Sequence, residues 1–303
     1  MLSALYESTN GIAYAPTLVR NLRLGKLDKD DVSNIFVCRK CGQVVSLYEN
    51  GSIPVFRHSK LEEPRCLYGH SFHRNFTPTK FGLLNSLSKR QEVKNLDVEK
   101  IIDGEIADIY FELKDEFKIA ILLTYPKIHV KDITRTYIHF SKRDIYCLYI
   151  LPWDPPYFKV KYLKDWEIYL HAMYFSRLYY YYGEDMVRPV NHKSLTFMDY
   201  SYGKKKLISK CIAHEEISII DNFHVKDIKR GFKDIFPGKI FIDHLENNWY
   251  EPYSKMNKNR FIKPGTQGNY VLKVIDDEDL EILPRTLKKY KSSKNPKKGK
   301  KDE

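Results

Sequence analysis

A stretch in the middle of the chain constrains the fold most. Two apolar runs rich in β-branched and aromatic residues, 105–112 and 118–125, are separated by the charged link 113–117. This pattern predicts two strands joined by a hairpin turn. A polar, helix-like segment, 129–142, leads to a third apolar run, 144–151. Strand, strand, helix, strand outlines a small α/β core whose last strand lies parallel to one of the first two.

Asp108 lies inside the first apolar run. A carboxylate in such a strand is costly to bury unless it is paired or binds a cation. The other interpretation is an acid at a strand edge that faces water. Glu112, four residues further on, would lie roughly 13 Å along the strand, which is too far to share one ion with Asp108.

Length and composition set outer limits. A chain of 303 residues forms one large domain or two ordinary ones. It has no run of eighteen apolar residues and no basic region before its first apolar residues, so we expect neither a transmembrane helix nor a signal peptide. Five cysteines, two of them in a CxxC pair, suit a metal site in a reducing cytoplasm better than a disulfide framework.

The formal net charge of +12 favours a polyanionic partner, usually nucleic acid. The charge is unevenly placed, because residues 288–303 hold eight lysines against Asp302 and Glu303. A lysine-rich end with Ser, Asn, Pro and Gly is typical of disorder. The rest of the chain is only mildly basic, so charge by itself gives weak support for DNA binding.

The strongest chemical signal is Cys38-Arg-Lys-Cys41-Gly42, followed after a strand-like segment by His58 and Cys66. Two cysteines at this spacing can both reach one tetrahedral ion, and Gly42 lets the backbone fold tightly around the sulfurs. The sequence therefore predicts a zinc site with four ligands, Cys38, Cys41, His58 and Cys66. Closed four-ligand sites are structural, so this zinc would hold its subdomain together.

Other interpretations of this cluster remain open. His70 or His73 can replace one of the four ligands. The cysteines can also be ordinary buried thiols with an unrelated CxxC spacing. A thioredoxin-like redox pair is disfavoured, because no βαβ unit surrounds the motif.

Two elements are predicted around the motif. Asn10-Gly11 between two short apolar runs is typical of a β-hairpin, so residues 1–37 should begin a small β element. Thr77 before a proline predicts the start of an amphipathic helix that ends near Gln91. The apolar residues of this helix share one face: Phe81, Leu84 and Leu87. Residues 92–102 are then expected to lead into the core strands.

The order of these features resembles the CoiA family of competence proteins. The features are CxxCG, a Phe-Arg-His, a further Cys, a Ser-x-His before a Lys-bearing helix, a Glu, an Ile-Ala-Asp strand, a hairpin and a helix with Arg135. The resemblance covers roughly residues 1–200, and its combination of motifs is more specific than any one of them. It implies a zinc-ribbon-like N-terminal part, a nuclease-like core of the PD-(D/E)xK type, and a role in processing or recombining incoming DNA.

The resemblance also implies roles for single residues. Cys38, Cys41, His58 and Cys66 match the zinc positions. Asp108 matches the Asp that binds Mg²⁺ or Mn²⁺, Glu99 the preceding acid, and Lys80 a helix position that is often basic. These three would form the catalytic site.

The chain departs from the family pattern in the second core strand. Where the family has Ile-Glu-x-Gln, the chain has Leu122 and Thr124 at the polar positions. Phosphodiester hydrolysis by this route needs one or two divalent cations held by several carboxylates. A core that has lost its catalytic function is therefore favoured, and an active metal-dependent nuclease is the alternative.

Beyond the core the signals are weaker. A helical pattern from Asp165 passes into a tyrosine run at 179–182, which can stack on bases but is more typical of a buried strand. A basic turn at 201–206 offers Lys204, Lys205 and Lys206 as phosphate contacts, with Arg135 in the core, or it is a solvated loop.

We therefore predict an α+β protein in four parts. They are a zinc-bound β subdomain (1–75), a restriction-endonuclease-like core (76–160), a mixed α/β region (161–287) and a lysine-rich tail (288–303). Three functions stay open: a DNA-binding protein that does not cut, an active nuclease, and a regulatory module that binds a protein partner.

Overall fold

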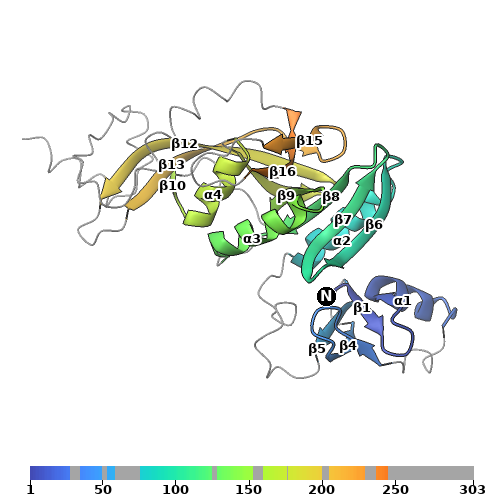
Figure 1. The fold of residues 1–303 in the computed structure, drawn as a ribbon. Helices are drawn as coiled ribbons and strands as arrows, with labels where there is room; N and C mark the ends of the chain where they lie inside the picture. The colour runs from blue at the N-terminus through green and yellow to red at the C-terminus, as the bar shows by residue number, and fades with distance from the viewer. Residues whose placement is uncertain are drawn as a thin grey trace, which may run out of the picture. The chain divides into compact units, whose positions relative to one another are not determined.

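The computed structural model describes residues 1–27, 35–49, 53–58, 76–124, 128–152, 160–175, 177–199, 205–228 and 237–244. Within these ranges it contains four helices, an N-terminal antiparallel sheet and a large mixed sheet, an α+β architecture (Figure 1). The chain divides into two compact units. The first comprises Met1–Asp154, Tyr179–Pro189 and Glu215–Glu246, and the second comprises Pro155–Leu178, Val190–His214 and Asn247–Glu303.

The N-terminal sheet has the strand order β2-β1-β3-β4-β5, with every neighbouring pair antiparallel. Its elements are β1 (Ser3–Tyr6), β2 (Ile12–Tyr14), α1 (Ala15–Arg23), β3 (Phe36–Val37), β4 (Val44–Tyr48) and β5 (Val55–His58). The hairpin predicted around Asn10-Gly11 is confirmed, because β1 pairs with β2 and Asn10 adopts the left-handed conformation with a φ of 54°.

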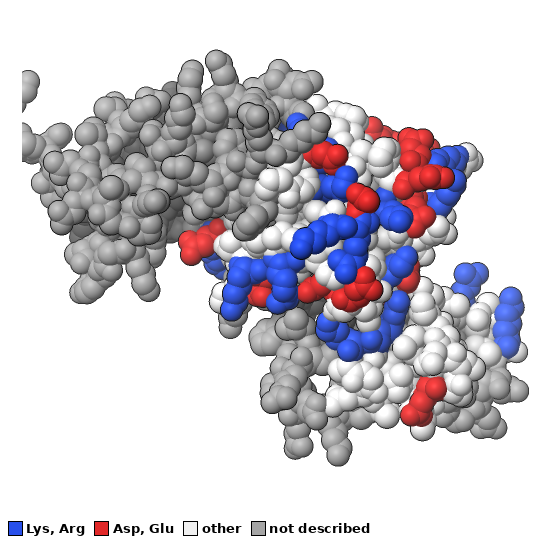
Figure 2. Space-filling model, in the orientation of Figure 1, with Lys and Arg blue, Asp and Glu red and all other residues white. Residues whose placement is uncertain are grey.

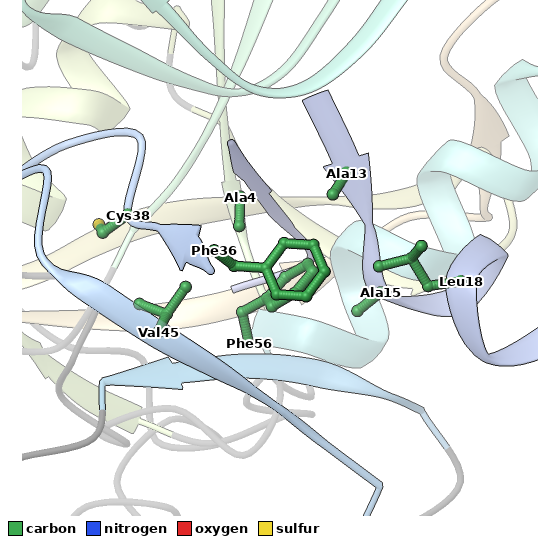
Figure 3. Close-up of a cluster of buried hydrophobic side chains, with 8 residues drawn as sticks. All are labelled: Ala4, Ala13, Ala15, Leu18, Phe36, Cys38, Val45 and Phe56. Atoms are coloured by element: carbon green, nitrogen blue, oxygen red, sulfur yellow. The ribbon is translucent and has the colours of Figure 1, made fainter. Parts of the chain in front are cut away.

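A small apolar core lies between this sheet and α1 (Figure 3). Its buried members are Ala4, Ala13, Ala15, Leu18, Phe36, Cys38, Val45 and Phe56. The rings of Phe36 and Phe56 lie 5.0 Å apart at its centre, and burying each stabilises the sheet by roughly 2–3 kcal/mol. Because Cys38 is part of this core, packing fixes the first residue of the CxxC motif.

The middle of the chain forms the predicted α/β core. Its elements are α2 (Phe76–Leu87), β6 (Val93–Ile102), β7 (Glu105–Leu113), β8 (Lys118–Leu123), α3 (Val130–Ser141) and β9 (Ile145–Leu151). Strands β6, β7 and β8 are antiparallel neighbours, and β9 lies parallel to β8 as predicted. Helix α2 packs against β6 and β7, and α3 packs against β9.

Strand β6 was predicted only as a connection, and that prediction is wrong. It is a ten-residue strand, but its pairing with β7 shifts register between Lys94 and Asp97. Asn95 and Glu99 within it have positive φ angles. These irregularities break the two-residue alternation by which a strand is recognised in a sequence.

Helix α2 is present, but its predicted buried face is wrong in part. It ends at Leu87, and its buried residues are Thr79, Lys80, Leu83 and Leu87. Phe81 and Leu84 are only half-buried. The helix is rotated from the expected orientation so that a lysine points into the protein.

The remaining elements extend the mixed sheet. They are β10 (Val160–Leu163), α4 (Asp165–Met173), β11 (Arg177–Gly183), β12 (Met186–Asp199), β13 (Lys205–Ala213), β14 (Ile217–Ser218), β15 (Phe223–Ile228) and β16 (Gly238–Asp243). In the first unit, β11 and β16 both pair in parallel with β9, β15 pairs with β16, and β14 pairs with the start of β12. In the second unit, β13 pairs with β10 and with the end of β12.

Two predictions for this region can be compared with the structure. The tyrosine run follows a helix as predicted, and Tyr179 and Tyr180 are fully buried, so the core interpretation holds for these two. Lys205 and Lys206 do not lie in a turn, because they begin β13 and pair with Asp199 and Met198. No helix in the described ranges is long and apolar enough to cross a membrane.

Candidate metal centre and buried charge cluster

Three of the four predicted zinc ligands meet at one end of the N-terminal sheet. The sulfur atoms of Cys38 and Cys41 and a ring nitrogen of His58 lie within 4.8 Å of one another. The Cys41 Sγ atom is 3.2 Å from His58 Nε2. A tetrahedral zinc ion would hold a sulfur and a nitrogen ligand about 3.5 Å apart, so the spacing suits one ion.

Local backbone geometry presents the two cysteines. The Cys38 N–H donates to the Gln43 carbonyl at 2.7 Å, and the Gly42 N–H donates to the Cys38 carbonyl at 2.9 Å. Gly42 closes this turn with a φ of +71°, a conformation that L side chains rarely adopt. The turn therefore requires the glycine that follows the CxxC motif, as the sequence indicated.

The donor set of two sulfurs and one imidazole fits zinc chemistry. Cys38 is buried, His58 is half-buried and Cys41 is exposed, so an ion can reach the cluster from solvent. The cluster can therefore bind a metal ion such as zinc. The predicted fourth ligand, Cys66, lies outside the described residues, as do His70 and His73, the possible replacements for one ligand.

Side chains from the same turn connect the metal cluster to the core. The Arg39 Nη1 atom donates to the Val98 carbonyl at 2.7 Å, and the guanidinium also pairs with Asp97. The Lys40 Nζ atom donates to the Gly104 carbonyl at 2.5 Å. The two residues between the cysteines therefore join the turn to β6 and to the β6–β7 turn.

The three predicted catalytic residues also lie together, and they form ion pairs with one another. The Lys80 ammonium lies 2.8 Å from Asp108 Oδ1 and 3.1 Å from Glu99 Oε1. The side chains of Lys80 and Glu99 are 7% and 5% exposed, and that of Asp108 is 15% exposed. A carboxylate is tolerated in an apolar strand when it is paired with an opposite charge or binds a cation. Here Lys80 provides the opposite charge and offsets the cost of burying the two acids.

Glu99 has further partners at Leu2 and at Ser3, the first residue of β1. Its Oε1 atom accepts the Leu2 N–H at 3.2 Å, and its Oε2 atom accepts the Ser3 N–H and the Ser3 hydroxyl, both at 3.0 Å. Glu99 has a φ of +57°, which costs a non-glycine residue on the order of 1 kcal/mol. Its carboxylate therefore joins the N-terminal sheet to the core at the expense of local backbone strain.

The pairing fixes the charges of this cluster. Burial by itself would raise the pKa of Glu99, but the Lys80 charge, the charge of the N-terminal ammonium and the hydrogen bond from Ser3 lower it to about 2. Burial would lower the pKa of Lys80, yet the adjacent Asp108 and Glu99 carboxylates hold it above its usual value. Lys80 and Glu99 are thus both charged at neutral pH.

Asp108 gains no second acid from the neighbouring strand. Its Oδ2 atom accepts the Leu123 N–H at 2.8 Å. Continuing the β7–β8 register by one residue from the Ile109–Ile121 pair places Leu122 opposite Asp108. Thr124 is buried, and its hydroxyl donates to the Ile150 carbonyl at 3.4 Å.

Glu112 is not part of the cluster, as expected from its distance along the strand. Its carboxylate accepts hydrogen bonds from Tyr110 and Asn95. These two bonds lower the pKa of Glu112. The described cluster therefore contains two acids and one lysine.

The structure describes the predicted nucleic-acid contacts only in part. Arg135 is 63% exposed and forms ion pairs with Glu105 at 2.9 Å and with Asp132 at 3.4 Å. The structure does not describe the side chains of Lys205 and Lys206, and Lys204 and the tail 288–303 lie outside the described residues. Their role in binding stays a prediction.

Sequence reasoning missed the contribution of β1 to the buried charge cluster. Leu2 and Ser3 donate to Glu99 across almost a hundred residues of chain. Nothing in the local sequence of either segment indicates this contact.

Comparison of the chain with models of known protein families, with curated proteins and with solved structures finds no match.

Proposed function

We propose that this protein binds DNA through a nuclease-like fold whose core does not cut the strand. Its role would lie in DNA uptake, recombination or mobile-element biology, as the resemblance to the CoiA family implies. A zinc ion on Cys38, Cys41, His58 and Cys66 would have a structural role.

The position of the Lys80 ammonium is the observation that carries this proposal. It touches both acids that the resemblance assigns to a divalent cation, at 2.8 Å and 3.1 Å. Hydrolysis of a phosphodiester by the PD-(D/E)xK route requires those acids to hold the cation that activates water. Here they neutralise a lysine of the same chain.

The surroundings of the acids support the same conclusion. Both oxygens of Glu99 accept hydrogen bonds, one from Leu2 and one from Ser3, and one oxygen of Asp108 accepts the Leu123 N–H. Leu122, opposite Asp108, offers no oxygen ligand. A divalent cation at this place would have to displace Lys80 and break several hydrogen bonds.

DNA affinity is expected mainly from the N-terminal part and the lysine-rich end. Residues 1–75 contain ten basic side chains against seven acidic ones, a net charge of +3, and residues 288–303 contain eight lysines against two acids. The described residues from 76 to 152 contain equal numbers of basic and acidic side chains. Figure 2 shows the two kinds interspersed over the core.

An active nuclease is the second candidate. One lysine and two acids are the residue types of PD-(D/E)xK chemistry, and Lys80, Glu99 and Asp108 do gather in space. In this case Lys80 would move aside when a cation and DNA bind. Asp108, the more exposed of the two acids, would be the first ligand.

A cleavage assay separates the two candidates. Protein that keeps its structural zinc but is dialysed free of Mg²⁺ and Mn²⁺ is incubated with single- and double-stranded DNA and with Mg²⁺ or Mn²⁺. The two controls are Asp108→Ala and wild type without either added metal. We expect DNA binding without cleavage, and equal DNA affinity for Asp108→Ala. Cleavage that disappears in both controls would establish the active nuclease instead.

A further inference from the structure

Two adjoining hollows lie between the N-terminal part and the core, and Leu2, which donates to Glu99, is part of the lining of the second. The first, of about 360 Å³, is lined by Pro16, Val19, Arg20, Arg23, Leu24, Pro54 and Phe81. The second, of about 470 Å³, is lined partly by Pro16, Tyr14, Phe81, Leu84, Lys94 and Leu96. Pro16 and Phe81 line both, so the two hollows form one groove between α1 and α2. Each is in the size range of ligand sites, roughly 300–1,000 Å³.

The groove has a floor of apolar side chains and three basic side chains, and the second hollow also has the neutral polar residues Thr17, Asn85, Ser88 and Asn95 in its lining. Phe81, at the junction of the two hollows, is a half-buried aromatic ring, and prolines and leucines continue the floor on both sides. Arg20 and Arg23 stand at one end and Lys94 at the other. No Asp or Glu lines either hollow within the described residues. The lining therefore attracts an anion that also has apolar surface.

The two arginines are available to a ligand. Arg20 and Arg23 lie in the last turn of α1, and both are exposed. Arg20 forms no ion pair within the described ranges. Among the described residues Arg23 pairs only with Glu49, at 3.2 Å. Both side chains are exposed, so this pair contributes little and can exchange for a phosphate. Guanidinium groups bind phosphate oxygens in a bidentate manner.

We propose that this groove binds single-stranded DNA. Unpaired bases would pack on Phe81 and the neighbouring apolar side chains, while Arg20, Arg23 and Lys94 contact phosphates. Aromatic surface beside a positively charged groove is the usual arrangement for single strands. A duplex keeps its bases stacked inside and could not use the apolar floor. The proposal rests on the proposed DNA-binding function and names its site and strand preference.

The test compares two double variants of the full-length protein. Arg20→Gln/Arg23→Gln removes two charges from the groove. Lys89→Gln/Lys114→Gln removes the same charge from exposed core positions that line neither hollow. Affinity for a labelled oligothymidine of about 12 nucleotides is measured by fluorescence anisotropy at several salt concentrations. A blunt duplex and a polyglutamate peptide serve as competitors.

We expect the groove variant to bind oligothymidine about tenfold more weakly, with a salt slope lower by about 1.4, while the core variant stays within about twofold of wild type. Equal affinity of the groove variant and wild type would overturn the groove assignment alone. Absence of DNA binding by wild type would instead overturn the proposed function. Stronger competition by the duplex, or by polyglutamate, would show that the groove takes another ligand and overturn the assignment to single strands.

A second variant tests the apolar floor. Phe81→Leu keeps the side chain apolar but removes the aromatic ring. We expect weaker binding of oligothymidine with an unchanged salt slope, because stacking and not charge is lost. Unchanged affinity would exclude stacking on Phe81. The unfolding temperature of each variant, compared with wild type, checks that the fold is retained.

Discussion

The Cys38–Cys41–His58 cluster and the Lys80–Glu99–Asp108 cluster lie in the same compact unit, and each gathers residue types that bind metal ions. They differ in whether the chain already supplies the cation. The cysteine cluster contains only electron-pair donors, and one of them faces solvent. The acidic cluster contains an ammonium group that contacts both carboxylates. The comparison teaches that residue types alone do not define a metal site, because the groups that already contact those residues decide what they can bind.

The two clusters are also linked. Arg39, between the two cysteines, donates to Ser3 Oγ at 3.1 Å, and the same hydroxyl donates to Glu99. Glu99 in turn contacts Lys80. A metal ion that orders the cysteine turn would therefore also support the position of β1 against the acidic cluster.

Removing the metal should have the largest effect. Structural zinc in small domains contributes on the order of 10 kcal/mol of apparent folding free energy. We expect wild-type protein to contain one zinc ion, and Cys41→Ser to lose both the zinc and the folded N-terminal sheet. Cys41 is exposed, so its substitution costs little packing. Zinc content by mass spectrometry and thermal unfolding measure the two effects.

Cys147→Ser is the matched control for this prediction. Cys147 lies fully buried in β9, far in sequence from the metal cluster, and burial raises the pKa of its thiol. This variant should be less stable but keep its zinc. Retention of a full equivalent of zinc by Cys41→Ser would contradict the metal assignment.

Removing the internal cation should have the next largest effect. Lys80→Met removes the ammonium that contacts both Glu99 and Asp108, which costs about 3–5 kcal/mol of unfolding free energy. Millimolar Mg²⁺ or Mn²⁺ should recover part of this loss, because the freed carboxylates can then bind a divalent cation. Urea unfolding with and without each metal measures both effects.

Wild-type protein provides the comparison for the metal effect. Its carboxylates are already paired, so the same metal concentrations should not shift its unfolding midpoint. A strong shift in wild type would show that Lys80 yields its place to a cation, as the active-nuclease candidate requires.

Acid should weaken the same cluster. The pKa of Glu99 is lowered from an ordinary value of 4.5 to about 2, so the folded state holds this proton more weakly than the unfolded state. The stabilisation is complete above about pH 4.5 and is lost as the pH falls towards 2; at most it amounts to about 3 kcal/mol. The difference in unfolding free energy between wild type and Glu99→Gln should therefore shrink between pH 4.5 and pH 2. A difference that does not depend on pH would argue against a charged Glu99.

The smallest effect is expected at Arg135. Its ion pairs with Glu105 and Asp132 are exposed, so Arg135→Gln should change the unfolding free energy by less than about 1 kcal/mol. DNA affinity of this variant tests whether the residue contacts phosphate. An affinity loss as large as that of Arg20→Gln/Arg23→Gln would place part of the DNA contact on the core.

Local patterns in the sequence predicted the elements that depend on nearby residues. The hairpin of β1 and β2, the strands β7, β8 and β9, helix α3 and the cysteine turn follow from alternation, turn residues and ligand spacing. Strand β6 was not predicted because its register shift and positive φ angles interrupt the alternation of apolar and polar residues that marks a strand. The buried face of α2 was misjudged because a lysine in an apolar helix is ordinarily assigned to the surface.

The sequence by itself determined that Cys38 and Cys41 can share one ion and that Asp108 lies within an apolar, strand-forming run, because both statements depend on residues a few positions apart. Only the tertiary structure decided what the acids do. Lys80, Glu99 and Asp108 come from α2, β6 and β7, and Ser3 from β1 completes their contacts. The energy of a buried charge depends on which groups surround it in space, and no local pattern encodes those neighbours.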